Sequence, residues 1–150
     1  NVIPAISTVK NGISWRQSVY YPLYFASLYG RGESLQLKIN SPKYSSDIAD
    51  DVNYVDASAV INEEEKTLSF FIINRSEEES VDLDFDINNL PIIKIIDQQI
   101  INHTNIYASN TINKPNEIVP KKTNIATFQN EKLMAKIPKL SYLFILLKIK

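Results

Sequence analysis

Apolar and acidic side chains alternate one by one along residues 81–87. The apolar positions are Val81, Leu83, Phe85 and Ile87, and the acidic positions are Asp82, Asp84 and Asp86. Because successive side chains of a β-strand point to opposite faces, this pattern predicts a strand with one face on a core and one in water. The segment is the clearest strand of the chain, and it directs the chain toward a half-buried antiparallel sheet.

Short segments of the same kind recur along most of the chain. Further strands are predicted at residues 35–39, 57–62, 67–74, 92–101, 125–128, 132–137 and 142–148. The last of these is apolar on both faces and is therefore predicted to be a central strand. Residues 102–116 are rich in Asn, Thr and Ser and indicate a long loop, with a short strand near Ile106. Many short strands with frequent turns favour an all-β fold, an antiparallel β-sandwich.

The first 32 residues have a different character. Residues 2–6 form a short apolar run typical of a strand buried on both faces. Residues 22–29 are predicted to be a short helix, with Pro22 at its first position and Gly30 as a left-handed C-terminal cap. A helix that is apolar all round is normally buried on every side. Too little chain precedes this one to cover it, so we expect its covering partner to lie elsewhere, on a longer protein.

Composition excludes several classes of function. The 150 residues are 44% hydrophobic and 22% charged, as in one ordinary globular domain. With 16 basic and 17 acidic residues, no single-sign field argues for nucleic acid or an anionic membrane. The longest apolar run, residues 143–147, is far short of the roughly 20 residues of a spanning helix. The absence of cysteine permits a cytoplasmic protein.

The acidic residues do not predict a catalytic pair or a metal site. Residues 63–65 and 77–79 are glutamates at turn tips, where solvent prevents the raised pKa that a general acid needs. A charged turn that blocks edge pairing is the favoured interpretation. The aspartates of residues 82–86 lack the Gly and Glu of an EF-hand loop, because Ile87 and Ile93 occupy those positions. They fit the polar face of a strand instead.

Two other groups of residues have competing interpretations. His103 is the only histidine and lies in a polar loop, so a surface position is favoured over a metal or catalytic role. Four tyrosines close to the predicted helix could stack on a sugar or a base, although packing in a core is the better interpretation; they are Tyr20, Tyr21, Tyr24 and Tyr29. No cofactor, no metal and no catalytic set is predicted from composition and spacing.

Four stretches carry a resemblance to a known family. They are residues 1–6 (NVIPAI), residues 15–22 (WRQSVYYP) with 26–32, residues 51–64 with 73–75, and residues 138–141. In this order they resemble the C-terminal end of the α-L-arabinofuranosidases of glycoside hydrolase family 51. In residues 1–6 the order Pro4-Ala5 is swapped relative to the family's usual Asn-Val-Ile-Ala-Pro-Ile.

The resemblance implies an architecture and an activity. Family members join a (β/α)₈ barrel to a C-terminal, jelly-roll-like β-sandwich. Residues 1–32 would then be the last strand and helix of the barrel, and residues 33–150 the sandwich. The parent enzyme would release terminal α-L-arabinofuranosyl residues from arabinan or arabinoxylan oligosaccharides with retention, and would be cytoplasmic and a homo-oligomer. The barrel would cover the apolar helix.

The resemblance also implies two residues near the sugar. Gln17 matches a glutamine that reaches the furanose from the barrel rim, and Trp15 would be a pocket wall or, slightly favoured, a packing residue. Neither catalytic glutamate motif of the family matches any position here, so this chain alone is expected to be inactive. The alternative functions are a carbohydrate-binding module, which needs exposed coplanar aromatic residues, and a protein–protein interaction domain.

Overall fold

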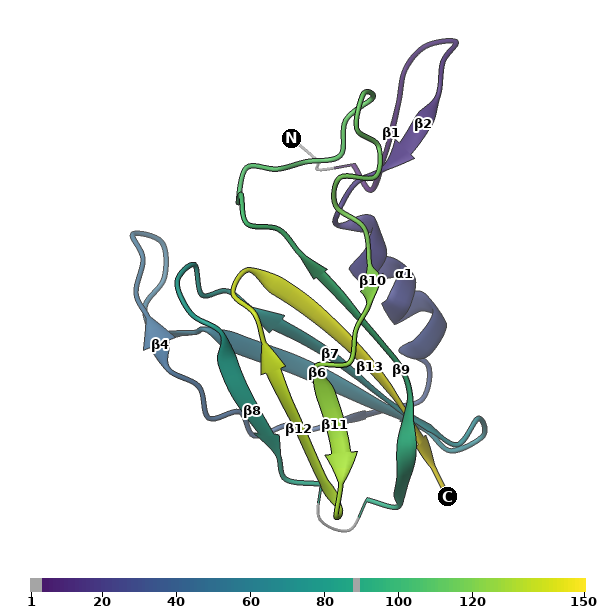
Figure 1. Ribbon diagram of the computed structural model, residues 1–150, viewed down its shortest axis with the longest axis vertical. Coiled ribbons are helices and arrows are strands. Elements are labelled where there is room, and N and C mark those ends of the chain that lie inside the picture. Colours follow the sequence, from purple (N-terminus) through teal and green to yellow (C-terminus); the bar gives the residue numbers. More distant parts are fainter. Residues whose placement is uncertain (1–3, 88–89) are drawn as a thin grey trace.

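The computed structural model describes residues 4–87 and 90–150 and is rich in strands (Figure 1). The one helix among these residues is α1 (Tyr20–Tyr29). The strands are β1 (Ile6–Thr8), β2 (Ser14–Arg16), β3 (Glu33–Leu35), β4 (Lys43–Tyr44), β5 (Val52–Asn53), β6 (Val55–Asn62), β7 (Thr67–Asn74), β8 (Val81–Phe85), β9 (Ile92–Asn102), β10 (Lys121–Lys122), β11 (Ala126–Gln129), β12 (Lys132–Ile137) and β13 (Ser141–Ile149).

Two antiparallel sheets face each other and form a sandwich. The larger sheet has six strands in the order β10-β9-β13-β7-β6-β3, and the smaller has three in the order β11-β12-β8. Two small hairpins, β1-β2 and β4-β5, lie outside these sheets. The prediction of an all-β antiparallel sandwich with a short N-terminal helix is confirmed.

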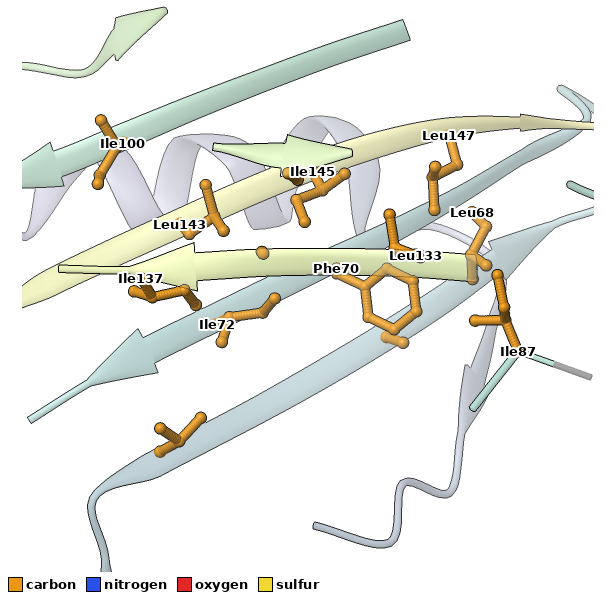
Figure 2. Close-up of a cluster of buried hydrophobic side chains, with 14 of the residues drawn as sticks. Leu68, Phe70, Ile72, Ile87, Ile100, Leu133, Ile137, Leu143, Ile145 and Leu147 are labelled. Atoms are coloured by element: carbon orange, nitrogen blue, oxygen red, sulfur yellow. The ribbon is translucent and has the colours of Figure 1, made fainter. Parts of the chain in front are cut away.

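The main core fills the space between the two sheets. Figure 2 shows side chains of β7, β12 and β13 meeting there. Fully buried members include Leu68, Ile72, Leu133, Ile137, Leu143, Ile145 and Leu147. The core exists because each sheet has an apolar face that must be removed from water, and the two faces cover each other.

Strands β8 and β13 show how the sequence pattern becomes burial. In β8 the apolar side chains are partly buried, whereas Asp82 and Asp84 are exposed, and Lys136 of β12 lies 3.8 Å from the Asp82 carboxylate. Strand β13 lies between β7 and β9 and is covered on both faces, as predicted for residues 142–148. Alternation therefore identified the half-buried strand, and two apolar faces identified the central strand.

Helix α1 lies on the outer face of the six-stranded sheet (Figure 1). Tyr21 and Phe25 are buried there in a second cluster that includes Ile101 of β9 and Phe144 of β13. The opposite face of the helix stays exposed within this chain, at Leu23 (59%), Tyr24 (44%) and Leu28 (43%). Within this chain the helix is therefore not buried on every side, because the sheet covers only one of its faces.

Several local predictions for the N-terminal region are wrong. The helix begins at Tyr20, so Pro22 is its third residue, and Gly30 has φ −91°, which is not left-handed. Residues 1–3 of the predicted buried strand lie outside the described residues. Ile6 belongs to the hairpin strand β1, whose partner β2 is antiparallel, and its side chain is 51% exposed.

Later in the chain, residues 106–107 form a turn rather than a short strand.

The backbone conformation at Gly32, with φ +138°, requires a glycine. A Cβ atom there would lie 2.2 Å from the main-chain oxygen of Ile61 in β6. Only glycine combines this backbone angle with so close an approach to another strand.

Candidate functional site

The hairpin β1-β2 carries both residues that the resemblance assigns to the sugar site. Ser7 pairs with Trp15 across the hairpin, and Gln17 follows two residues later. Side chains at i and i+2 of a strand share a face, and directly paired residues do too. Ser7, Trp15 and Gln17 therefore lie on the same side, and the main-chain N–H of Gln17 extends the pairing by donating to the oxygen of Ala5 at 2.9 Å.

These side chains meet one residue from a distant loop, Asn110. The indole Nε1 of Trp15 donates to the main-chain oxygen of Asn110 at 2.9 Å, and the amide Nε2 of Gln17 donates to the same oxygen at 3.0 Å. Nε2 of Gln17 also donates to Oγ of Ser7 at 2.9 Å. The structure thus brings Trp15 and Gln17 together on a single acceptor.

Asn110 is held by its own side chain. Its Nδ2 donates to the main-chain oxygens of Arg16 (2.8 Å) and Ile118 (2.9 Å), and its Oδ1 accepts from the N–H of Ile118 (2.7 Å). The residue is only 1% exposed. The amide closes the loop from Asn110 to Ile118 and ties that loop to the hairpin. No sequence signal separated Asn110 from the other asparagines of residues 102–116, because its partners are distant in sequence.

The cluster of Ser7, Trp15, Gln17 and Asn110 contains no ionisable side chain. It cannot move a proton, but neutral amides and hydroxyls can hold a neutral polar ligand by hydrogen bonds. Trp15 and Gln17 are both half-buried. The arrangement is suited to orientation of a ligand rather than to bond cleavage.

The acidic residues considered in the sequence analysis lie on other elements than this cluster. The glutamates of residues 63–65 and 77–79 are exposed at turns, and the side chains of Asp82, Asp84 and Asp86 are exposed on the smaller sheet or at its end. Within residues 4–87 and 90–150 no group of three or more His, Cys, Asp or Glu side chains could hold a metal ion.

His103 lies in the loop after β9, as predicted for a loop residue. Its Nε2 is 3.5 Å from a carboxylate oxygen of Glu117, and its Nδ1 accepts from the N–H of Asn105 at 3.0 Å. The contact with Glu117 joins the two ends of the loop that carries Asn110, whereas the bond from Asn105 is local to the start of that loop. His103 therefore has a structural role in the loop's shape.

The four tyrosines near the helix are interpreted either as core residues or as a surface for stacking on a sugar or base. Tyr21 is buried and Tyr29 stacks on Phe144 at 4.9 Å, as expected for core residues. Tyr20 and Tyr24 stack on each other at 5.8 Å, and Tyr24 is 44% exposed. Packing on the sheet therefore explains part of the group, and Tyr24 belongs to the exposed helix face.

An open pocket of about 460 Å³ lies between the start of α1 and the adjoining ends of β7, β9 and β13. Its lining includes Val19, Ile101 and Tyr142. The hydroxyl of Tyr142 is buried, and in the described part of the chain it is the one buried side-chain polar atom without a hydrogen-bond partner. Burial raises the pKa of Tyr142, because the ionised phenolate is poorly solvated there.

Comparison with known proteins agrees with the resemblance. Residues 1–141 match the family model of the alpha-L-arabinofuranosidase C-terminal domain. An intracellular exo-alpha-(1->5)-L-arabinofuranosidase of Bacillus subtilis is 38% identical over 148 residues, which are 99% of this chain and 29% of that protein. A similarly named protein of Halalkalibacterium halodurans is 35% identical over 95% of this chain and 28% of its own length.

Solved structures show the same fold. A family 51 alpha-L-arabinofuranosidase from Bifidobacterium longum matches 99% of this chain and 28% of its own, with a TM-score of 0.88 and 26% identity. A GH51 arabinofuranosidase from Xanthomonas axonopodis matches 90% of this chain and 27% of its own, with a TM-score of 0.80 and 20% identity. The chain spans less than a third of the length of these relatives.

Proposed function

The chain belongs to the family of α-L-arabinofuranosidase C-terminal domains, and from this premise we propose that it serves a glycoside hydrolase that removes terminal α-L-arabinofuranosyl residues. The observation that carries the proposal is the match of nearly the whole chain to relatives named for that activity, at 38% identity in the Bacillus subtilis protein. The chain contributes a non-catalytic domain. The catalytic groups come from the rest of the protein.

Retaining glycosidases use two carboxyl groups about 5–5.5 Å apart, one as acid/base and the other as nucleophile. The glutamates of residues 63–65 and 77–79 are exposed at turns, and the half-buried Asp97 is paired with Lys122, so none of them has the setting of such a catalytic carboxyl group. The two parts of the complete protein therefore have different roles. The barrel of the complete protein performs the chemistry with retention, and the sandwich of this chain supports the barrel.

The proposed boundary lies near residue 32. Residues 1–32 are the end of the barrel, and residues 33–150 are the sandwich. The exposed apolar face of α1 supports this division, since Leu23, Tyr24 and Leu28 would be removed from water by a barrel packed beside them. The hairpin residues Ile6 and Ile13, 51% and 52% exposed, belong to the same proposed contact.

Gln17 is the proposed sugar-binding residue of the chain. Its amide lies at the end of the hairpin, half-buried and fixed by two hydrogen bonds, and could reach a furanose at the barrel rim. Trp15 lies on the same side, and its indole N–H donates a hydrogen bond to the main-chain oxygen of Asn110. That bond favours a packing role for Trp15 over a wall of the pocket.

The substrate class follows from the names of the relatives. Several are called exo-alpha-(1->5)-L-arabinofuranosidases, and one from Bifidobacterium longum is called an exo-alpha-(1->6)-L-arabinofuranosidase. The proposed substrates are therefore arabinan- or arabinoxylan-derived oligosaccharides with terminal arabinofuranose. The relatives called intracellular favour a cytoplasmic enzyme, and family likeness favours a homo-oligomer. None of the helices in the described ranges is long and apolar enough to cross a membrane.

An assay of the complete protein beside this chain alone tests the proposal. On an aryl α-L-arabinofuranoside we expect hydrolysis by the complete protein and none by residues 1–150. The chain alone is also titrated with arabino-oligosaccharides by calorimetry. Saturable binding would favour a carbohydrate-binding module, and a complete protein that is inactive on arabinofuranosides but captures another protein would favour an interaction domain.

A further inference from the structure

Both hydrogens of the Gln17 side-chain amide are already in use. One is donated to Oγ of Ser7 at 2.9 Å and the other to the main-chain oxygen of Asn110 at 3.0 Å. A primary amide has two N–H donors and one oxygen that accepts. The nitrogen of Gln17 therefore has no hydrogen left for a ligand.

The orientation of this amide is determined by chemistry. The oxygen of Asn110 is a carbonyl and can only accept, so the Gln17 atom that faces it must be the nitrogen. The Gln17 oxygen, Oε1, then points away from Asn110. No side chain or main-chain group in residues 4–87 and 90–150 donates a hydrogen bond to Oε1.

The position of the Asn110 carbonyl is itself fixed. The buried Asn110 side chain bonds the main chain of Arg16 on the hairpin and of Ile118 at the other end of its loop. Three hydrogen bonds on a 1% exposed residue leave the carbonyl little freedom. The loop after β9 thus holds the amide of a residue that lies 93 positions earlier in the sequence.

We propose that Asn110 and Ser7 are positioning residues that orient Gln17 so that its oxygen accepts a hydrogen bond from a sugar hydroxyl. This inference rests on the proposed contact between Gln17 and arabinofuranose. It assigns the contact a direction: Gln17 accepts and the sugar donates. It also gives the sandwich domain a part in substrate binding, because Asn110 comes from a loop between β9 and β10.

The experiment uses the complete enzyme and an aryl α-L-arabinofuranoside. Four single variants are compared, namely Gln17→Ala, Asn110→Ala, Ser7→Ala and Asn74→Ala. Asn74 is the matched control, because it is also a 1% exposed asparagine whose Nδ2 lies within hydrogen-bond distance of three main-chain oxygens, which share its two hydrogens. It lies on β7, outside the hairpin cluster. Each variant is also melted, so that kcat/KM is compared among folded proteins.

We expect Gln17→Ala and Asn110→Ala to lower kcat/KM by about tenfold or more, and Ser7→Ala by about threefold, the usual range for loss of one or two hydrogen bonds. Asn74→Ala should lower the Tm and leave kcat/KM within about twofold of the parent value. In a Gln17→Ala background, Asn110→Ala and Ser7→Ala should have almost no further effect on kcat/KM, since both act through Gln17.

The outcomes separate this inference from the proposed function. If Gln17→Ala loses activity but Asn110→Ala and Ser7→Ala act equally with and without Gln17, positioning is refuted and the sugar contact stands. If Gln17→Ala keeps full activity, the sugar contact fails and the positioning role fails with it. If Asn110→Ala does not fold, Ser7→Ala decides the question, because that small substitution leaves the loop intact.

Discussion

The ring of Phe25 in α1 lies almost parallel to the ring of Phe144 in β13, with centroids 4.7 Å apart and planes 5° apart. Both side chains are buried, and Tyr29 stacks on the same phenylalanine. Stacked aromatic pairs of this kind stabilise the fold beyond the effect of the apolar area that they remove from water. This stack holds the helix on the outer face of the six-stranded sheet.

Replacement of Phe25 should detach or loosen the helix. We expect Phe25→Ala to lower the free energy of unfolding by about 3–5 kcal/mol, because it removes a buried ring and leaves a cavity. Urea unfolding of the chain measures the change. Leu23→Ala is the matched control on the exposed face of the same helix and should cost less than about 0.5 kcal/mol in this chain. Equal costs for the two variants would contradict the observed packing of α1.

Tyr142 should tolerate loss of its hydroxyl. The hydroxyl is buried without a partner, and burial without a hydrogen bond costs about 1–3 kcal/mol. Tyr142→Phe should therefore leave stability at pH 7 unchanged or raise it by about 1 kcal/mol. Thermal unfolding of the two proteins at one pH is the measurement, and a clear loss of stability would show that the hydroxyl has a partner.

The same variant should alter the dependence of stability on alkaline pH. Burial raises the pKa of Tyr142 above its ordinary value of 10.0. From pH 10 upward the unfolded chain loses this proton while the folded chain keeps it, so the folded state loses stability relative to the unfolded state as pH rises. In Tyr142→Phe this contribution is absent. The stability difference between variant and parent should grow above pH 10 and stay constant below it.

Gln98 should connect the two sheets. Its buried amide on β9 donates to the oxygen of Ala126 at 2.9 Å and accepts from the N–H of Ala126 at 2.8 Å, and Ala126 begins β11 of the smaller sheet. Gln98→Ala should lower stability by about 2–4 kcal/mol, since it leaves two buried main-chain groups unpaired. Its neighbour Gln99, which bonds the side chain of Asp97, provides the control. Gln99→Ala should cost less than about 1 kcal/mol in the same urea titration.

Gly32 should not accept a side chain. Gly32→Ala puts a Cβ atom 2.2 Å from the oxygen of Ile61 and demands φ +138° of an L-residue. We expect a loss of about 1–3 kcal/mol or more, seen as a lower Tm. The comparison is Gly12→Ala in the β1-β2 turn, where the closest atom to the new Cβ is a methyl carbon of the exposed Val9 side chain and the nearest main-chain atom is 3.7 Å away. If the two substitutions cost the same, the backbone of β6 does not constrain Gly32.

The strands were predictable because their signal is local. Successive side chains of a strand point to opposite faces, so a short segment is enough to show whether one face or both faces are apolar. This is how β8 was predicted to be half-buried and β13 to be central. The start of α1 and the conformation of Gly30 were not predictable in this way. They depend on the turn after β2, where the N–H of Tyr20 donates to the main-chain oxygen of Gln17. They also depend on tertiary neighbours, about which the helix propensities of single residues carry no information.

The candidate site was predictable only in part. Trp15 and Gln17 were singled out by family resemblance, whereas Asn110 and Ser7 had no sequence signal. A polar residue in a loop has the same appearance in sequence whether it is exposed or buried. The bond between Gln17 and Asn110 exists because the loop after β9 returns to the hairpin, which no pattern within either segment specifies.

The order of residues alone determined that this chain forms an antiparallel sandwich and that it resembles the end of an arabinofuranosidase, because period-two patterns and motifs are properties of neighbouring residues. Only the tertiary structure decided which face of α1 is covered and which atom of Gln17 the described residues engage. Those properties depend on contacts between segments far apart in the chain, here Phe25 with Phe144 and Gln17 with Asn110, and such contacts form only when the two sheets and the loop are assembled.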